Sequence, residues 1–268
     1  MNNIPQQLYG IIGYPLGHSQ SPRVHNAAFT AAGLSKVYMA WPTPPEKLAA
    51  LIDAVRTLPI AGLSVTIPHK ERIIPLLDAI TPAAHQVGAV NTVFWKDGAL
   101  CGHNTDMAGF MAPLQGKKLC SALVLGAGGA ARAVLAGLQT LGYTSILTNH
   151  HLPKAMALAH EFQIEYVPWE KRTHVQVDIL INATPLGMQG DGQDKSPYPA
   201  AAFAPNGGLA YDLVYTPLHT RFLREAHAAG WDIQDGLDMF AAQAAEQFHL
   251  WTGESLDPKT VRATLEKA

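Results

Sequence analysis

Side chains that could transfer a proton stand directly after two of the predicted strands. Lys70 follows the apolar segment 62–68, which predicts a buried strand. Open α/β sheets place ligands at the carboxyl ends of their strands, so this ammonium group is a candidate for acid–base chemistry, although a lysine at a helix start is also commonly solvated. Asp106 precedes a predicted helix over 107–114 and could serve as a carboxylate base or could simply cap that helix.

Two serines lie between a predicted strand over 9–14 and a predicted helix that begins at Pro22. Ser21 before a proline is typical of a helix N-cap followed by a first-turn proline, and this explains Ser21 without any ligand. Ser19 is left unexplained. Two hydroxyls so close to the positive end of a helix could both donate to one carboxylate.

A glycine-rich turn joins the apolar strand predicted over 119–125 to an amphipathic helix, and a further strand over 144–148 follows. Strand, turn, helix and strand in this order are typical of a dinucleotide-binding unit. Gly126 would permit the tight turn, Gly128 would let backbone N–H groups approach a pyrophosphate, and Ala131 is small enough for close helix–strand packing. Such turns also occur at plain strand-to-helix junctions, so a purely structural turn stays open.

The rest of the chain alternates strands and helices, which indicates an α/β fold. Lys96, Asp97 and Gly98 predict a hairpin turn, and the Gly- and Pro-rich segment 187–208 predicts a long surface loop. The other predicted strands cover 37–41, 89–95, 99–102, 164–167, 177–182, 209–215 and 231–234. The other predicted helices cover 45–58, 70–78, 154–162, 218–229 and 237–251, with a last one after Pro258.

The composition predicts a compact enzyme of about two domains. Of its 268 residues 48% are hydrophobic and only 15% charged, which argues against disorder. A net charge of −2 without a basic run argues against a nucleic-acid partner. Cys101 and Cys120 form no disulfide framework, and we find no signal peptide or membrane-spanning run, so we expect a cytoplasmic protein. The histidines show no metal-binding spacing, so no metal is expected.

Motifs along almost the whole chain resemble those of the shikimate dehydrogenase family, which includes shikimate and quinate dehydrogenases. They are Ser-Val-Thr-Ile-Pro-His-Lys (64–70), Ala-Val-Asn-Thr (89–92), Asn-Thr-Asp (104–106), Gly-Ala-Gly-Gly-Ala (126–130), Tyr-Asp-Leu-Val-Tyr (211–215) and Asp-Gly-Leu-Asp-Met (235–239). The resemblance implies an α/β protein in which a Rossmann-type NAD(P)-binding domain, over 105–237, is inserted into an α/β substrate-binding domain. That second domain would cover 1–104 and be completed by helices over 238–268.

The resemblance also implies roles for individual residues. Lys70 and Asp106 would be the catalytic acid–base pair. The substrate would be held by Ser19 and Ser21, which would bind its carboxylate, and by Thr66, Lys70, Asn91, Asp106, Tyr215 and Gln243, which would hold the ring hydroxyls. The cofactor would be held by Gly126, Ala127, Gly128, Gly129, Ala130, Asn149, His150, Lys154, Thr184, Leu213, Gly236 and Met239. Met239 also fits an ordinary core position on an apolar helix.

The chemistry of alcohol oxidation agrees with this pair. When a hydride leaves an alcohol carbon for nicotinamide, the hydroxyl proton must also leave, and the reverse reaction must return it. An ammonium beside a carboxylate can accept and supply that proton and can polarise the ketone.

One departure from the family pattern concerns the cofactor. NADP-dependent members typically carry Asn-Arg-Thr-x-x-Arg after the second strand of the nucleotide unit, whereas this chain has Asn-His-His-Leu-Pro-Lys at 149–154. His150 thus replaces the planar arginine that would grip the 2′-phosphate. No acidic side chain is present to bind a free ribose 2′-hydroxyl either. The neutral and basic side chains favour NADP, with NAD possible.

The leading hypothesis is a shikimate dehydrogenase that reversibly reduces 3-dehydroshikimate to shikimate with NADPH, as a step of chorismate and aromatic amino acid biosynthesis. The serine at 21 is typical of members that prefer shikimate, whereas quinate users more often carry threonine there. The alternatives are an NAD-dependent quinate/shikimate dehydrogenase and a non-catalytic nucleotide-binding regulator. The sequence leaves monomer and homodimer open.

Overall fold

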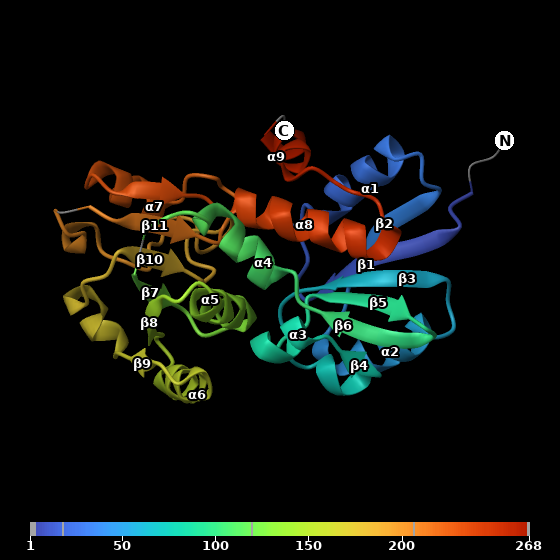
Figure 1. Ribbon diagram of the computed structural model, residues 1–268, viewed down its shortest axis with the longest axis horizontal. Helices are drawn as coiled ribbons and strands as arrows, with labels where there is room; N and C mark the ends of the chain where they lie inside the picture. Colours follow the sequence, from blue (N-terminus) through green and yellow to red (C-terminus); the bar gives the residue numbers. More distant parts are fainter. Residues whose placement is uncertain (1–3, 18, 119, 206, 267–268) are drawn as a thin grey trace. The chain divides into compact units, whose positions relative to one another are not determined.

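The chain forms two compact units in the computed structural model, which describes residues 4–17, 19–118, 120–205 and 207–266 (Figure 1). Unit 1 spans Met1–Thr105 and Ala241–Ala268, and unit 2 spans Asp106–Phe240. Each unit is built on one six-stranded sheet. Since unit 2 falls between the two segments of unit 1, the predicted α/β fold with one domain inserted into the other is confirmed.

Unit 1 contains a mixed sheet in the order β2-β1-β3-β5-β6-β4. β1 pairs in parallel with β2 and with β3, whereas β5 runs antiparallel to β3 and to β6. The predicted β5–β6 hairpin is present, and positive φ angles of 51° at Asp97 and 80° at Gly98 are those that a type I′ turn requires. The strands are β1 Gln7–Gly13, β2 Lys36–Pro42, β3 Ile60–Val65, β4 Ala79–Ile80, β5 Thr92–Lys96 and β6 Ala99–His103.

Helices cover both faces of this sheet, because β1 alternates its apolar side chains between them. Ile12 packs with Ile52 of α2 on one face, while Tyr9 packs with Phe29 of α1 and Phe248 of α8 on the other. The helices of unit 1 are α1 Ser21–Ala31, α2 Leu48–Val55, α3 Pro82–Val87 and α9 Pro258–Glu266. α8, Leu237–Thr252, begins in unit 2 and continues in unit 1.

Unit 2 contains a fully parallel sheet in the order β12-β11-β10-β7-β8-β9. The chain builds β7, β8 and β9 toward one edge and then continues with β10 on the other side of β7, so the order reverses between β7 and β10. This is the strand order of dinucleotide-binding sheets. The strands are β7 Ser121–Leu125, β8 Thr144–Thr148, β9 Glu165–Tyr166, β10 Ile179–Asn182, β11 Leu209–Asp212 and β12 Asp232–Gln234.

Buried side chains on both faces of the strands hold unit 2 together, as expected for a parallel sheet. Leu123 and Leu180 pack with Phe222 of α7 on one face. Phe110 of α4 stacks on Tyr211 of β11, with their ring centroids 5.3 Å apart. The helices are α4 Asp106–Met111, α5 Gly129–Thr140, α6 Leu152–Phe162 and α7 Arg221–Ala228.

The helix predicted over 70–78 is wrong. The structure has turns and a short 3₁₀ helix, Ile74–Leu76, followed by β4. Pro75 lacks the N–H group that a continuing helix needs. Asp78 is instead held by the neighbouring strand, since its N–H donates to Leu100 O (3.0 Å) and its carboxylate accepts the Leu100 N–H (2.7 Å).

Two further expectations need correction. Part of the predicted surface loop over 187–208 is core, because Tyr198 and Phe203 are buried against Trp231. Asn206 of that loop and Leu119 of the predicted strand over 119–125 lie outside the described residues. Ser21 is not the N-cap of α1 but its first residue; Gln20 holds the cap position and makes no side-chain cap bond.

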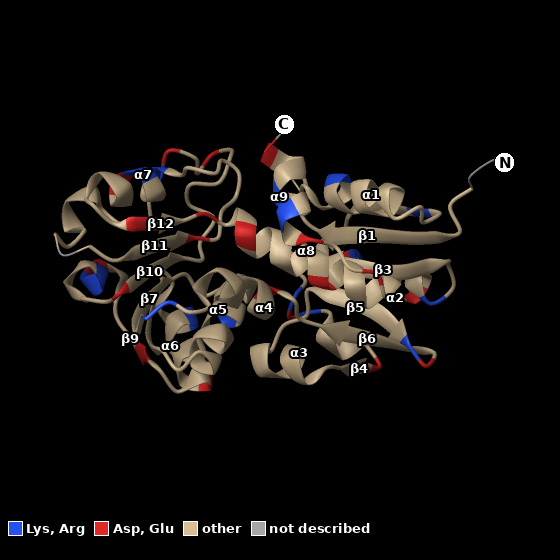
Figure 2. Cartoon of the chain, turned by 45° about the horizontal axis from the view of Figure 1, so that its top comes forward, with Lys and Arg blue, Asp and Glu red and all other residues tan. Residues whose placement is uncertain are grey.

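Basic and acidic residues are both spread along the helices and loops of each unit (Figure 2). No helix in the described ranges is long and apolar enough to cross a membrane. Within the same ranges, no group of three or more His, Cys, Asp or Glu side chains is placed to hold a metal ion.

Candidate active site

In unit 1 the predicted substrate residues gather at one edge of the sheet. β1, β2 and β3 are parallel and therefore end at the same edge, and β5 begins there because Thr92 pairs with Ser64 of β3. Backbone hydrogen bonds between neighbouring strand ends agree with this arrangement. Thr66 N–H donates to Ile12 O (2.9 Å), and Val65 N–H donates to Asn91 O (2.7 Å). Thr66 and Asn91, which are far apart in sequence, thus flank the same strand end.

Ser19 and Ser21 lie at the start of α1, just after β1. The Ser21 N–H donates to the Ser19 hydroxyl oxygen (3.3 Å), so the two residues are held together by the backbone of one turn. Ser21 is buried and Ser19 half-buried. This is compatible with two hydroxyls that serve one small anion at the first turn of a helix.

Lys70 is held by a backbone bond of its own and by a side-chain bond of the residue that precedes it. Its carbonyl accepts the Val90 N–H (2.8 Å), which ties it to the segment before β5. The preceding residue, His69, is fully buried, and its Nε2 lies 2.7 Å from the carbonyl oxygen of Thr43. A carbonyl only accepts, so His69 carries its proton on Nε2 and fastens the Lys70 turn to the segment after β2. Lys70 itself is half-buried.

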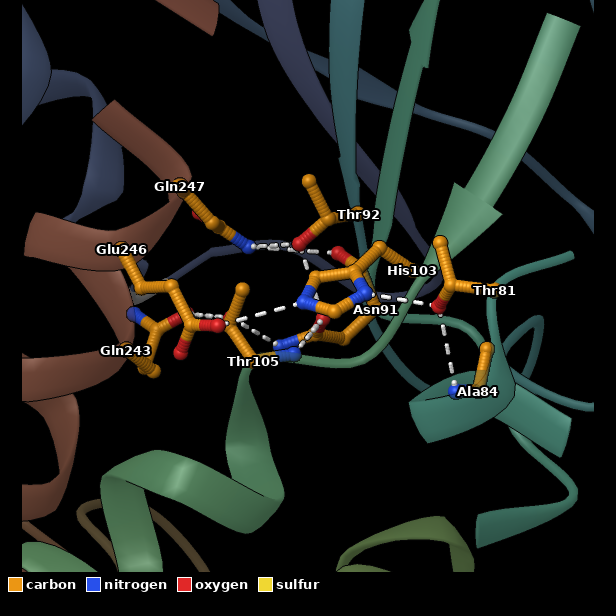
Figure 3. Close-up of polar contacts among 9 residues, drawn as sticks. All are labelled: Thr81, Ala84, Asn91, Thr92, His103, Thr105, Gln243, Glu246 and Gln247. Atoms are coloured by element: carbon orange, nitrogen blue, oxygen red, sulfur yellow. Dashed lines mark hydrogen bonds and ion pairs between the residues drawn. The ribbon is translucent and has the colours of Figure 1, made fainter. Parts of the chain in front are cut away.

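Asn91 and Gln243 are joined by Thr105 (Figure 3). The Asn91 Nδ2 donates to the Thr105 hydroxyl (2.9 Å), and this hydroxyl donates to Gln243 Oε1 (3.5 Å). The Thr105 N–H in turn donates to Asn91 Oδ1 (2.8 Å). All three side chains are buried, so each polar atom needs a partner and the network is well determined.

His103 lies beside this network at the end of β6. Its Nε2 is 3.2 Å from the Glu246 carboxylate on α8, and its Nδ1 is 2.7 Å from the Thr81 hydroxyl (Figure 3). Thr81 also caps α3, since it accepts the Ala84 N–H (3.3 Å). The end of β6 is thereby connected to both α3 and α8.

In unit 2 the glycine turn follows β7 as predicted and leads into α5. Gly126 has φ +118°, and a Cβ there would lie 2.8 Å from Ala183 O, so only glycine fits. Gly128 differs, because its φ of −104° suits any residue and a Cβ would meet no protein atom within 4 Å. Ala131 is fully buried, consistent with close helix–strand packing. Ala127, Gly129 and Ala130 complete the turn and the first residues of α5.

The residues after β8 lie at the same sheet edge. Asn149 is buried, and its Nδ2 donates to His151 O (3.2 Å). His151 is the N-cap of α6, because its Nδ1 accepts the Lys154 N–H (3.3 Å). His150 is exposed and approaches Trp169 edge-on, with their ring centroids 6.5 Å apart. Lys154 is exposed on the first turn of α6.

Two neighbouring strand ends are linked through buried side chains. Asn182, at the end of β10, accepts the Thr184 hydroxyl (2.6 Å) and the Thr184 N–H (3.0 Å) through Oδ1. Its Nδ2 donates to Asp212 at the end of β11 (2.9 Å). The Asp212 carboxylate also accepts the Thr220 hydroxyl (2.6 Å) and the Val214 N–H (2.9 Å). Burial raises the pKa of Asp212 to about 7, because the charged form loses its hydration.

The remaining predicted residues of unit 2 are Leu213, Gly236, Tyr215, Met239 and Asp106. Gly236 faces Leu213, and a Cβ on Gly236 would be 2.5 Å from Leu213 O, so the close approach requires glycine. Tyr215 packs against Phe240, with their ring centroids 4.5 Å apart. Met239 is buried. Asp106 is also buried and is the first residue of α4.

The sequence prediction did not include several residues that hold this site. Thr105 lies inside the Asn-Thr-Asp motif, so the motif itself could have drawn attention to it. Gln247 follows Gln243 by one helical turn, which places both on the same face of α8. Asn182 ends a predicted strand, where a polar side chain is a signal for a ligand site, whereas Asp212 lies inside the strand predicted over 209–215 and ends the observed β11.

Comparisons with known proteins point to one family. Residues 11–93 match the model of the shikimate dehydrogenase substrate binding domain, and residues 236–266 match that of the shikimate 5′-dehydrogenase C-terminal domain. The solved shikimate 5-dehydrogenase from Thermus thermophilus, in complex with NADP(H) and shikimate, has a TM-score of 0.88 at 42% identity, covering 97% of this chain and 99% of its own. The quinate dehydrogenase from Corynebacterium glutamicum, in complex with NAD, has a TM-score of 0.89 at 32% identity, covering 98% and 99%.

A shikimate dehydrogenase (NADP⁺) from Oleidesulfovibrio alaskensis is 53% identical over 99% of this chain and 96% of its own length. Identity at this level, over almost all of both chains, requires common descent and not only a shared architecture. This chain therefore belongs to the shikimate dehydrogenase family, as its motifs predict.

Proposed function

We propose that this chain is an NADP-dependent shikimate dehydrogenase, an oxidoreductase that reversibly reduces 3-dehydroshikimate to shikimate on the route to chorismate and the aromatic amino acids. The observation that carries the proposal is the 53% identity, over nearly the full length, with a relative named for this activity. The gathering of the motif residues at one edge of each sheet supports it.

Unit 1 would bind the substrate. Ser19 and Ser21 would bind its carboxylate at the first turn of α1, where the helix end favours an anion. Ring hydroxyls would be held by Thr66, Asn91 and Gln243, a role that the family resemblance also implies for Tyr215. Because Asn91 and Gln243 are joined through Thr105, their positions are set before any substrate arrives.

Lys70 and Asp106 would move the proton. In the direction of reduction, the Lys70 ammonium would donate to the ketone oxygen as this oxygen becomes a hydroxyl, and the Asp106 carboxylate would orient the group and share the proton. Acid–base catalysis of this kind contributes about 10²–10⁴-fold in rate. The bonds that fasten both sides of Lys70 would keep the ammonium in place.

The residues of unit 2 fit a nicotinamide dinucleotide. Neither backbone conformation nor protein packing requires glycine at position 128, so the remaining reason for a glycine is close approach by a ligand. The N–H groups of the first turn of α5 would bind the diphosphate. Asn149, His150 and Lys154 would line the adenosine 2′ position, and Thr184, Leu213, Gly236 and Met239 the nicotinamide end. When bound, the reduced cofactor supplies the hydride.

The test is a comparison of kcat/KM for NADP and NAD with shikimate and with quinate as substrates. The proposal predicts the highest value for NADP with shikimate. A wild-type protein that oxidises neither acid with either cofactor would remove the dehydrogenase assignment, and nucleotide binding without turnover would favour the regulator instead.

A second candidate function is that of an NAD-dependent quinate/shikimate dehydrogenase. His150 favours it, because an exposed imidazole provides a weaker grip on a 2′-phosphate than the planar arginine fork of NADP-dependent members. In the assay above, this function predicts a higher kcat/KM for NAD than for NADP.

We also propose that the enzyme acts in the cytoplasm, as a monomer or a homodimer. The two cysteines are free thiols, which agrees with a reducing compartment. Sedimentation analysis across a hundredfold range of protein concentration would distinguish the two oligomeric states, and fractionation of the source cells would test the compartment.

A further inference from the structure

A line of buried hydrogen bonds leads from the interior of unit 1 to the proposed substrate-binding amides, and we call it the polar relay. It consists of seven side chains, Tyr38, Ser64, Gln247, Thr92, Asn91, Thr105 and Gln243. All seven are buried. The last five are drawn in Figure 3, where they extend between α8 and the first residues of β5.

Along the relay, each side chain donates a hydrogen bond to the next, from Tyr38 to Gln243. The Tyr38 hydroxyl donates to Ser64 (2.7 Å), and the Ser64 hydroxyl donates to Gln247 Oε1 (2.8 Å). This bond fixes the Gln247 carboxamide, because its Nε2 must then point the other way, where it donates to the Thr92 hydroxyl (2.9 Å) and to Asn91 O (3.3 Å).

The second half of the relay continues this direction. The Thr92 hydroxyl accepts from Gln247, and it therefore gives its own proton to Asn91 Oδ1 (2.8 Å). That oxygen also accepts the Thr105 N–H, so the Asn91 amide nitrogen is turned toward the Thr105 hydroxyl (2.9 Å). Thr105 then donates to Gln243 Oε1 (3.5 Å), which turns the Gln243 amide nitrogen away from Thr105.

The start of the relay is held by packing. The Tyr38 ring stacks on His25 of α1, with their ring centroids 4.6 Å apart and the planes inclined by 17°. His25 is fully buried, and burial lowers its pKa to about 3, so the stacked ring is neutral. No group in the relay carries a charge, and all seven side chains are buried, so each hydrogen bond forms away from solvent.

We propose that Gln247 and Thr92 are positioning residues that set which atoms of the Asn91 and Gln243 carboxamides face the substrate. This inference rests on the proposed function, since it needs a substrate whose hydroxyls these amides bind. A carboxamide can donate from one end and accept at the other, so its orientation decides which hydroxyl pattern it recognises. Thr92 acts through Asn91 and does not itself bind substrate.

The principal test is the Thr92→Val variant, which keeps the side-chain volume and removes the hydroxyl. We expect kcat/KM for shikimate to fall about tenfold, mainly through KM, because Asn91 Oδ1 loses one of its hydrogen-bond donors and the amide is held less firmly in one orientation. KM for NADP should stay within about twofold. Thr92→Ser restores the hydroxyl and should recover most of the loss. Thr252→Val is the matched control, since its hydroxyl bonds only to the backbone near the end of α8.

A binding measurement separates positioning from a general loss of stability. We would measure the affinity of shikimate and of analogues that lack one of the two non-reacting ring hydroxyls. If the relay sets the amides, removing a hydroxyl should weaken binding to Thr92→Val less than binding to the wild type, because the two changes remove the same interaction. Equal losses in both proteins would overturn the proposal.

Gln247→Glu provides a second, independent variant. A carboxylate at this position cannot donate, so the Thr92 hydroxyl would turn its proton toward residue 247 and away from Asn91. We expect the same reduction in sensitivity to the missing ring hydroxyl. A wild-type protein that is inactive with shikimate would instead count against the proposed function, whereas wild-type activity with unaltered Thr92→Val and Gln247→Glu kinetics would refute the relay alone.

Discussion

The two units position their candidate residues in different ways. In unit 1 the carboxamides of Asn91 and Gln243 are held by other side chains, and the relay from Tyr38 to Gln243 is built entirely from neutral groups. In unit 2 much of the site is backbone, as in the turn at Gly126 and the approach of Gly236 to Leu213, and the side-chain link between two strand ends contains a buried carboxyl group, Asp212.

This difference matches the ligands that we propose for them. A small polyhydroxylated acid offers several hydroxyls at fixed positions, and oriented amides and hydroxyls can distinguish these positions one by one. A diphosphate is recognised by charge and by N–H groups at a helix end, which any sequence can supply if no side chain blocks the approach. Side-chain replacements should therefore affect unit 1 most, and added Cβ atoms should affect unit 2 most.

The largest expected effect is on catalysis. It removes the proposed proton donor of unit 1 and leaves cofactor binding by unit 2 unchanged. Replacement of Lys70 by alanine should lower kcat about 10²-fold or more, because the ketone oxygen loses its proton donor. The dissociation constant for NADP, measured by fluorescence titration, should be unchanged. Lys96→Ala, at the exposed end of β5, is the control and should behave like the wild type. Near-normal turnover of Lys70→Ala would remove this residue from the mechanism.

The second prediction uses the pH dependence of stability to distinguish the two units. The side-chain link of unit 2 contains Asp212, which can titrate, whereas the relay of unit 1 contains only neutral groups. Because the pKa of Asp212 is raised to about 7, the folded protein keeps a proton that the unfolded chain releases near pH 4. This group therefore lowers the free energy of unfolding as pH rises from about 4 to 7, by up to about 4 kcal/mol, and adds no further change above pH 7.

Urea unfolding of the wild type and of Asp212→Asn between pH 5 and pH 8 would test this expectation. Asp212→Asn should lack the decline, so its stability relative to the wild type should increase with pH. Parallel pH profiles for the two proteins would show that Asp212 is ionised throughout. Thr92→Val, by contrast, should give a profile parallel to that of the wild type, because the relay contains no group that titrates in this range.

The third prediction compares two glycines of the same turn. Gly126→Ala should destabilise unit 2 by about 1–3 kcal/mol, because φ is positive and the Cβ would meet Ala183 O. Gly128→Ala should leave the stability within about 0.5 kcal/mol and should instead weaken NADP binding. Thermal unfolding and cofactor titration of both variants would check this. If Gly128→Ala binds NADP normally, the turn is a structural junction and not a diphosphate site.

The smallest expected effect concerns the cofactor preference. His150→Arg should raise the ratio of kcat/KM for NADP to that for NAD about tenfold, because a bidentate guanidinium–phosphate contact contributes roughly 1.5–3 kcal/mol. His227→Arg, on α7, adds the same charge away from this segment and should leave the ratio unchanged. A ratio that does not change in His150→Arg would place the 2′-phosphate elsewhere.

The alternation of strands and helices predicted the fold class, because buried parallel strands leave long apolar segments. The motifs predicted the family, and both predictions are confirmed. The polar relay could not be predicted, since Gln247 and Asn91 are 156 positions apart and only the fold makes them neighbours. β4 has only two residues, too few to give a periodic pattern in the sequence. The predicted strand over 209–215 extends beyond the observed end of β11 at Asp212, so the sequence did not show that Asp212 ends a strand.

The hydrogen bonds of the Asn182 carboxamide couple the motions of two segments of unit 2. The Asn182 carboxamide holds the segment after β10 by accepting the Thr184 N–H and by donating to Leu186 O. Its nitrogen also donates to Asp212 at the end of β11, and Asp212 accepts the Val214 N–H, so loosening one segment disturbs the bonds that hold the other. Hydrogen exchange should therefore report a single opening event, in which the amide hydrogens of Thr184 and Val214 become accessible to solvent together.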